Sequence, residues 1–167
     1  MEEEPKIFTD KPNLPEAKEE LTNEDIERIT EEIKTLIMPL YDEIERIRKA
    51  NPKREAGGNI VNGKIELLDE SRWRENSVVG ESYETERKMG KEGILSFHTH
   101  PDYGLTNKSA QDILSTCYRL RNLIFHKDGV TLMIALKEMP IEQIQKIDEQ
   151  AWKEAQKEEE KWGDPAY

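Results

Sequence analysis

Residues 93–112 read GILSFHTHPDYGLTNKSAQD, and this stretch of the sequence decides the fold. Residues 93–98 form a short apolar run that fits a buried β-strand. Residues 107–122 have the apolar spacing of a helix. The core side of that helix is predicted to carry Ile113, Leu114, Cys117 and Leu120. A buried strand followed by an amphipathic helix predicts a mixed α/β domain.

Four polar side chains lie at the junction between this strand and this helix. Because side chains alternate along a strand, His98 and His100 point to the same side of the sheet. Ser109 and Asp112 are three residues apart at the start of the helix, so they share one helical face. Eight residues separate His100 from Ser109, and this connection can bring the four side chains to one point.

Two imidazoles and a carboxylate suit a catalytic Zn²⁺ ion, which keeps a fourth position for water. A lone His-x-His pair also occurs on protein surfaces and as core histidines with satisfied hydrogen bonds. Here the pair follows an apolar strand, precedes a proline and is followed by Ser-x-x-Asp at a helix start. This joint pattern favours a metal site. The predicted zinc ligands are therefore His98, His100 and Asp112.

An acidic segment and a long helix precede this unit. Residues 1–21 contain three prolines and no periodic apolar pattern, which predicts a flexible arm. A helix is predicted over residues 22–50, with Thr22 and Asp25 as a capping box and an interruption at Pro39. Its apolar stripe is predicted to face the core, and a surface for a partner helix is the alternative. The stripe comprises Ile26, Ile29, Ile33, Leu36, Leu40, Ile44 and Ile47.

The segment between the long helix and the motif is predicted to be rich in strands. Residues 57–61 and 64–68 look like a hairpin around Asn62-Gly63, a dipeptide suited to a type I′ turn. Residues 77–83 are a weaker strand candidate. Residues 84–92, ETERKMGKE, are predicted to form a polar loop.

After the motif, two more strands are predicted at residues 123–125 and 130–136, around a Lys-Asp-Gly turn signal. Pro140 opens a last helix with an apolar side. The sequence thus predicts an α/β domain of the α+β kind over residues 22–139, with a mixed sheet flanked by helices. A C-terminal helix and acidic tail follow over residues 140–167.

The chain carries a formal net charge of −11, most of it at the two ends. Residues 1–20 and 140–167 each have a net charge of −4. This balance argues against non-specific nucleic-acid binding, which needs a basic surface. No apolar run is long enough for a membrane span, and the acidic N-terminus lacks the apolar region of a secretory signal. Because Cys117 is the single cysteine, a cytoplasmic, reducing location is expected.

The segment HTHP at residues 98–101, followed by Ser109-x-x-Asp112, resembles the JAMM motif of the JAB/MPN metalloprotease family. That motif also has an upstream glutamate in a Glu-x-x-Gly setting after the first helix. Glu55 stands in such a setting, in the segment REAGG at residues 54–58. The resemblance covers residues 24–137 and is specific in the motif and loose elsewhere.

Carried over residue by residue, the resemblance implies that His98, His100 and Asp112 bind zinc. It implies that Glu55 is the general acid/base and that Ser109 helps to bind the oxyanion. The family pattern places seven residues between the second histidine and the serine, whereas this chain has eight. Helix capping is the alternative role of Ser109.

The resemblance further implies a JAB/MPN-like fold, which is related to that of the cytidine deaminases. The implied activity is a zinc-dependent peptidase or isopeptidase that hydrolyses peptide or isopeptide bonds of a protein or peptide substrate. Family members often act at the C-terminus of a ubiquitin-like modifier. Modifier-selective members have longer insertions than the short loops of this chain, so selectivity for one modifier linkage is not expected.

Two other function classes compete with this one. The chain is alternatively a non-catalytic MPN-type scaffold or binding module, or a metal-dependent relative in DNA processing or repair. A homodimer through the terminal helices is a further expectation. Among other candidates, Cys117 is predicted to be a core residue and His126 an exposed residue in a turn. Trp73 is predicted to be either a partner contact or an anchor between surface and core.

Overall fold

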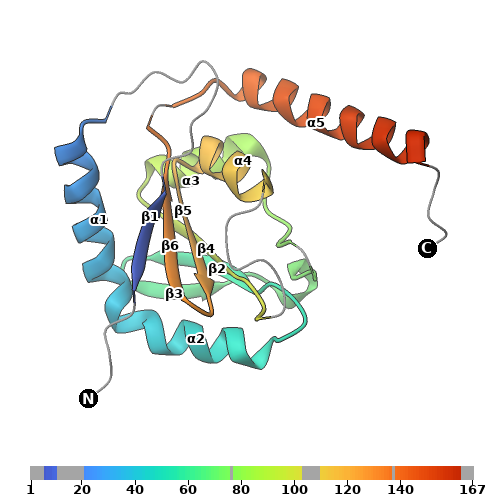
Figure 1. Ribbon diagram of the computed structural model, residues 1–167. Helices are drawn as coiled ribbons and strands as arrows, with labels where there is room; N and C mark the ends of the chain where they lie inside the picture. Colours follow the sequence, from blue (N-terminus) through green and yellow to red (C-terminus); the bar gives the residue numbers. More distant parts are fainter. Residues whose placement is uncertain (1–5, 11–20, 76, 103–109, 137, 163–167) are drawn as a thin grey trace.

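The computed structural model describes residues 6–10, 21–75, 77–102, 110–136 and 138–162. These residues form a mixed α+β structure around a six-stranded sheet with the order β1-β6-β5-β4-β2-β3 (Figure 1). The strands are β1 (Ile7–Asp10), β2 (Gly57–Val61), β3 (Lys64–Leu67), β4 (Leu95–Thr99), β5 (Arg121–His126) and β6 (Gly129–Ile134). The helices are α1 (Asn23–Ile37), η1 (Met38–Leu40), α2 (Tyr41–Ala50), η2 (Glu70–Arg72), α3 (Tyr83–Lys91), α4 (Ala110–Arg119) and α5 (Ile141–Trp162). The predicted fold class, a mixed sheet flanked by helices, is confirmed.

The sheet is mixed in its pairing. β1 runs parallel to β6 and β4 runs parallel to β5, whereas the other neighbours are antiparallel. The predicted hairpin of β2 and β3 is confirmed, because Asn62 and Gly63 have φ values of 51° and 73°, as a type I′ turn requires. The two strands predicted after the motif are β5 and β6.

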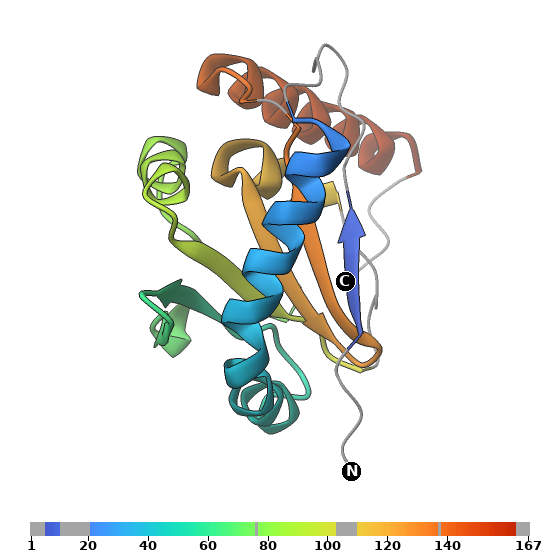
Figure 2. The same cartoon turned by 90° about the vertical axis from the view of Figure 1, so that its left-hand side faces the viewer.

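Helices α1 and α2 cover one face of the sheet, and α1 crosses in front of it in Figure 2. Thr22 and Asp25 form the predicted capping box, and Pro39 interrupts the helix in η1. The apolar stripe faces the core as predicted at Ile26, Ile29, Ile33, Leu40 and Ile44. Leu36 is 44% exposed, and Ile47 is only partly buried. Ile37 is buried instead, because a spacing of four residues from Ile33 keeps to the stripe of a 3.6-residue helix.

The opposite face of the sheet is covered by α4, whose Thr116 hydroxyl lies 3.6 Å from the sulfur of Met133 in β6. Helix α3 packs against α4. The prediction of a strand over residues 77–83 is wrong, because an isolated bridge between Trp73 and Val78 is the only strand-like pairing described there. The prediction of a loop over residues 84–92 is also wrong, since this segment forms α3.

Helix α3 has no apolar stripe because its buried positions are polar or glycine. Glu86 and Arg87 are buried, and Gly90 lies against the backbone of Arg119 in α4. Arg87 donates hydrogen bonds to the carbonyl oxygens of Cys117, Tyr118 and Met139. These hydrogen bonds compensate the burial of the charged Arg87 side chain. Because the buried residues of α3 are not apolar, the apolar pattern of the sequence does not reveal this helix.

The N-terminal segment of the described chain is a β-strand at the edge of the sheet. The prediction of a flexible arm over residues 1–21 is wrong for Ile7–Asp10, which pairs with β6 as an edge strand. This segment is held by its pairing with β6. It is also held by the stacking of Phe8 on His126, whose ring centroids are 5.9 Å apart. Residues 1–5 and 11–20 lie outside the described residues.

The last helix, α5, starts against α4 and then runs away from the body of the molecule (Figure 1). Ile144 near its start is buried with Cys117 and Met139, whereas Ile147 is 39% exposed. None of the helices in the described ranges combines the length and the apolar composition that crossing a membrane requires.

Candidate metal centre

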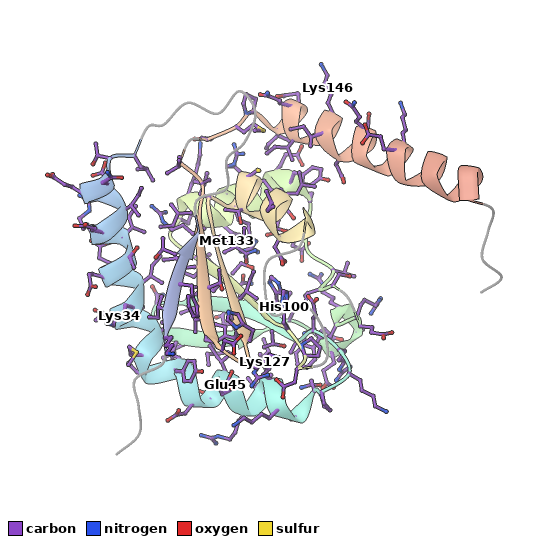
Figure 3. All side chains as sticks on the ribbon, in the orientation of Figure 1. Lys34, Glu45, His100, Lys127, Met133 and Lys146 are labelled. Carbon is purple, nitrogen blue, oxygen red and sulfur yellow. The ribbon has the colours of Figure 1, made fainter. Side chains whose placement is uncertain are left out.

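Both histidines of the HTHP segment lie at the end of β4, on the sheet face that α4 covers. Phe97 belongs to the core beneath α1 and α2, so alternation along the strand turns His98 to the other face. The backbone N–H of His100 donates to the carbonyl oxygen of Phe125 at 2.8 Å, which holds the end of β4 beside β5. Asp112 lies in the first turn of α4. All three polar side chains are buried, and Figure 3 shows His100 inside the molecule.

The side-chain atoms of this group lie within 3.4 Å of one another. His98 Nε2 lies 2.8 Å from Asp112 Oδ1 and 3.2 Å from His100 Nε2. His100 Nε2 lies 3.4 Å from Asp112 Oδ2. A tetrahedral zinc ion with ligands at 2.0–2.1 Å separates those ligands by about 3.3 Å. The structure thus brings the side chains of the three predicted ligands together in one cluster.

Glu55 joins the group from the segment between α2 and β2. Its two carboxylate oxygens lie 3.9 Å from His98 Nε2 and from His100 Nε2, farther than the three predicted ligands lie from one another. The ligand atoms of Glu55, His98 and His100 all lie within 4.8 Å of one another, so this set could also hold a metal ion. Glu55 therefore lies where it could be a fourth ligand of a metal ion or could contact a water molecule at the open coordination position.

Backbone contacts fix the position of Glu55. Its N–H donates to the carbonyl oxygen of Arg74 at 2.7 Å. The next residue, Ala56, donates its N–H to the hydroxyl of Thr99 at 3.0 Å and accepts the Thr99 N–H at 2.9 Å. Thr99 stands between the two histidines, so this pair of bonds ties Glu55 to the histidine strand.

Burial and mutual charge shift the titration of the cluster in the metal-free protein. Burial raises the pKa of Glu55, although the neighbouring His98 and His100 oppose the shift. Burial also lowers the pKa of His98, but the hydrogen bond and the charge of Asp112 outweigh it, so that the pKa of His98 is raised. Both shifts favour the protonated forms of Glu55 and His98.

The other sequence candidates have different surroundings. Ser109 lies outside the described residues. The prediction that His126 is exposed is wrong, because its ring is buried in the β5–β6 hairpin, where Nε2 lies 2.8 Å from the Thr131 hydroxyl. Cys117 is buried as predicted, and burial raises the pKa of its thiol to about 11. Trp73 is buried beneath the Arg54 guanidinium, which identifies it as an anchor.

A cleft runs from this cluster along the sheet face between β4, α3 and α4. Glu55, His98 and Asp112 line it together with Glu86 and Arg119. The sequence did not indicate Glu86, because α3 was predicted to be a loop. The only available signal was the Ser82-x-x-Thr85 cap at the start of α3.

No family model, curated protein or solved structure matches this chain. The likeness to the JAMM motif therefore rests on the residues themselves and on their arrangement.

Proposed function

We propose that this protein is a zinc-dependent peptidase or isopeptidase of the JAMM type, with a JAB/MPN-like fold. Its substrates would be peptide or isopeptide bonds of proteins, including those at the C-terminus of a ubiquitin-like modifier. The observation that carries the proposal is the spacing of 2.8–3.4 Å among the side-chain atoms of His98, His100 and Asp112. Zinc bound by these residues supplies Lewis acidity that activates water and polarises a carbonyl group.

In this proposal Glu55 is the general acid/base. Its carboxylate is partly buried beside the ligands but lies farther from them than they lie from one another, which suits a water molecule between them. From there Glu55 accepts a proton from the attacking water and later donates it to the leaving amine. Ser109 is proposed to bind the oxyanion, as the resemblance implies.

The alternatives receive less support from the described residues. A scaffold needs no cluster of two carboxylates and two imidazoles in a largely buried position. DNA processing needs cations near the site, yet Arg119 is the only lysine or arginine among the described residues that line the cleft. It is buried and paired with Glu86.

Zinc content tests the ligand assignment. The purified protein should bind one zinc ion per chain, and His98→Ala, His100→Ala or Asp112→Ala should each lose most of it. His126→Gln is the matched control, because this buried imidazole lies outside the cluster and the variant should keep its zinc. Undiminished zinc in the folded His100→Ala variant would contradict the assignment.

Hydrolysis tests the catalytic role. A fusion of a ubiquitin-like modifier to a reporter, together with a mixture of peptides, provides the substrates. Glu55→Gln should keep its zinc and its fold but lose activity by about 10²–10⁴-fold, the usual contribution of a positioned acid/base. The control is Glu66→Gln on the exposed strand β3. A zinc-loaded wild-type protein that cleaves nothing would favour the scaffold.

A further inference from the structure

A buried cation beyond the end of the histidine strand is not used by the proposed chemistry. Arg48 lies in the last turn of α2, and its side chain is buried. Its Nε and Nη2 donate to the two carboxylate oxygens of Glu45, at 2.8 and 2.9 Å. Paired hydrogen bonds of this kind fix the plane of a guanidinium group. They also raise the pKa of Arg48 against the opposing effect of burial, so the side chain stays charged.

The third nitrogen of this guanidinium group, Nη1, donates to Asp102 Oδ1. Asp102 directly follows the HTHP segment and is 54 positions from Arg48 in the sequence. Its side chain is 68% exposed, whereas that of Arg48 is 6% exposed. An ion pair between two exposed side chains is weak, because both side chains lose freedom when it forms. Here Glu45 already holds the guanidinium group, so only Asp102 has to be immobilised.

A short and stiff segment joins this ion pair to His100. Pro101 alone separates Asp102 from His100, and it is buried. A proline ring fixes its own φ and confines the preceding residue to extended conformations. His100 is the first residue after β4, and its N–H donates to the carbonyl oxygen of Phe125 at 2.8 Å. The backbone of His100 is therefore held between two fixed points, β5 on one side and Arg48 on the other.

We propose that Arg48 is a positioning residue, which holds the His100 imidazole in place for a metal ion by its ion pair with Asp102. Helix α2 lies on the face of the sheet opposite to α4. The cluster is thus held from both faces, by Asp112 on α4 and by Arg48 on α2. The connection from Arg48 to His100 belongs to the fold, whereas its effect on metal binding rests on the proposed function.

The charge of Asp102 provides a competing explanation. A carboxylate near a metal site attracts the cation whatever the carboxylate is bonded to. The two explanations differ in the part that Arg48 plays. If Asp102 acts by its charge, its contribution to metal affinity survives the loss of Arg48. If Asp102 acts by its position, its contribution disappears together with Arg48.

Amide hydrogen exchange of the full chain without metal tests the positioning directly. Asp102→Ala should raise the exchange rate of the His100 N–H by about three- to tenfold, because the backbone after β4 loses one of its two fixed points. Glu81→Ala is the matched control, since Glu81 is also an exposed carboxylate that accepts from an arginine, Arg72. The control should leave this rate unchanged. A wild-type exchange rate at His100 in the Asp102→Ala protein would overturn the proposal.

Competition with a chelating indicator then measures the dissociation constant of zinc. Asp102→Ala should raise this constant by about tenfold, the lower end of the effect of residues that orient metal ligands. Asp102→Asn keeps an oxygen that can accept from Arg48 and should have a smaller effect. Glu45→Gln/Arg48→Met removes both charges of the inner pair, so that no lone charge stays in the interior, and should match Asp102→Ala. Glu81→Ala should keep the wild-type constant.

Combining the changes separates position from charge. In the folded Glu45→Gln/Arg48→Met protein, a further Asp102→Ala should change the dissociation constant by less than about twofold, the usual error of additivity. An effect of about tenfold that persists there, or equal effects of Asp102→Asn and Asp102→Ala, would assign Asp102 to charge and overturn the positioning role. A wild-type protein that binds no zinc would contradict the proposed function instead, and the exchange rate at His100 would still decide whether Arg48 positions this residue.

Discussion

Thr99 links the two halves of the candidate site, and Thr99→Val isolates that link. Valine has nearly the shape of threonine, so the fully buried position would gain no cavity. The change removes the hydroxyl that accepts the N–H of Ala56, a residue that is itself fully buried. A buried N–H without a partner costs about 1–3 kcal/mol. For a chain of this size, the melting temperature should fall by about 2–12 °C.

The functional consequence of Thr99→Val should appear at Glu55, which precedes Ala56. A displacement of about 1 Å at a catalytic group lowers turnover by about 10²-fold, so we expect a loss of about 10- to 100-fold. Zinc content should be unchanged, because the ligand side chains of His98 and His100 do not bond to the Thr99 hydroxyl in the described contacts.

The assay combines thermal unfolding, zinc analysis, amide hydrogen exchange at Ala56 and turnover of the modifier fusion. Thr99→Ser keeps the hydroxyl and is the matched control, in which the exchange rate and the turnover should be close to those of the wild type. A Thr99→Val protein with wild-type exchange at Ala56 and wild-type turnover would refute the reasoning. Loss of zinc in that variant would refute it as well, because it would place the effect on the ligands.

Three further predictions concern the fold and its pH dependence. Gly90→Ala would place a Cβ 2.1 Å from the carbonyl oxygen of Arg119, so urea unfolding should show a loss of at least about 1–3 kcal/mol. Ile44→Ala in α2 should cost about 2–5 kcal/mol in the same assay, and a smaller loss would contradict the packing of α2. Because the folded-state pKa values of Glu55 and His98 are raised, metal-free protein should lose stability as pH rises above about 4.5 and then 6.5. Urea titrations from about pH 5 to 8 should show a flatter dependence for Glu55→Gln, and an unchanged slope would contradict the assignment.

Local signals in the sequence predicted the elements whose ends are fixed by their own residues. The Thr22 cap, the break at Pro39 and the Asn62-Gly63 turn each act within a few residues, and each appears in the structure. The histidine pair was predictable for the same reason, since strand alternation alone turns both rings to one face.

The missed elements depend on partners that are distant in the sequence. Helix α3 buries Glu86 and Arg87, and their partners in α4 and before α5 lie 30 or more residues away. Strand β1 exists because the edge of β6 accepts a short partner. The approach of Glu55 to the histidines also required the resemblance, because no spacing rule brings residues 43 positions apart together.

The charged residues that line the cleft balance one another. A zinc ion bound there would be neutralised by Asp112 and Glu55, and Arg119 pairs with Glu86. A cleft with balanced charges does not attract a charged substrate, and most of the chain's net charge of −11 belongs to its terminal segments. A peptide bond is uncharged and carries both a donor and an acceptor. Under the proposed function, the cleft would therefore bind its substrate without the counterion release on which nucleic-acid binding depends.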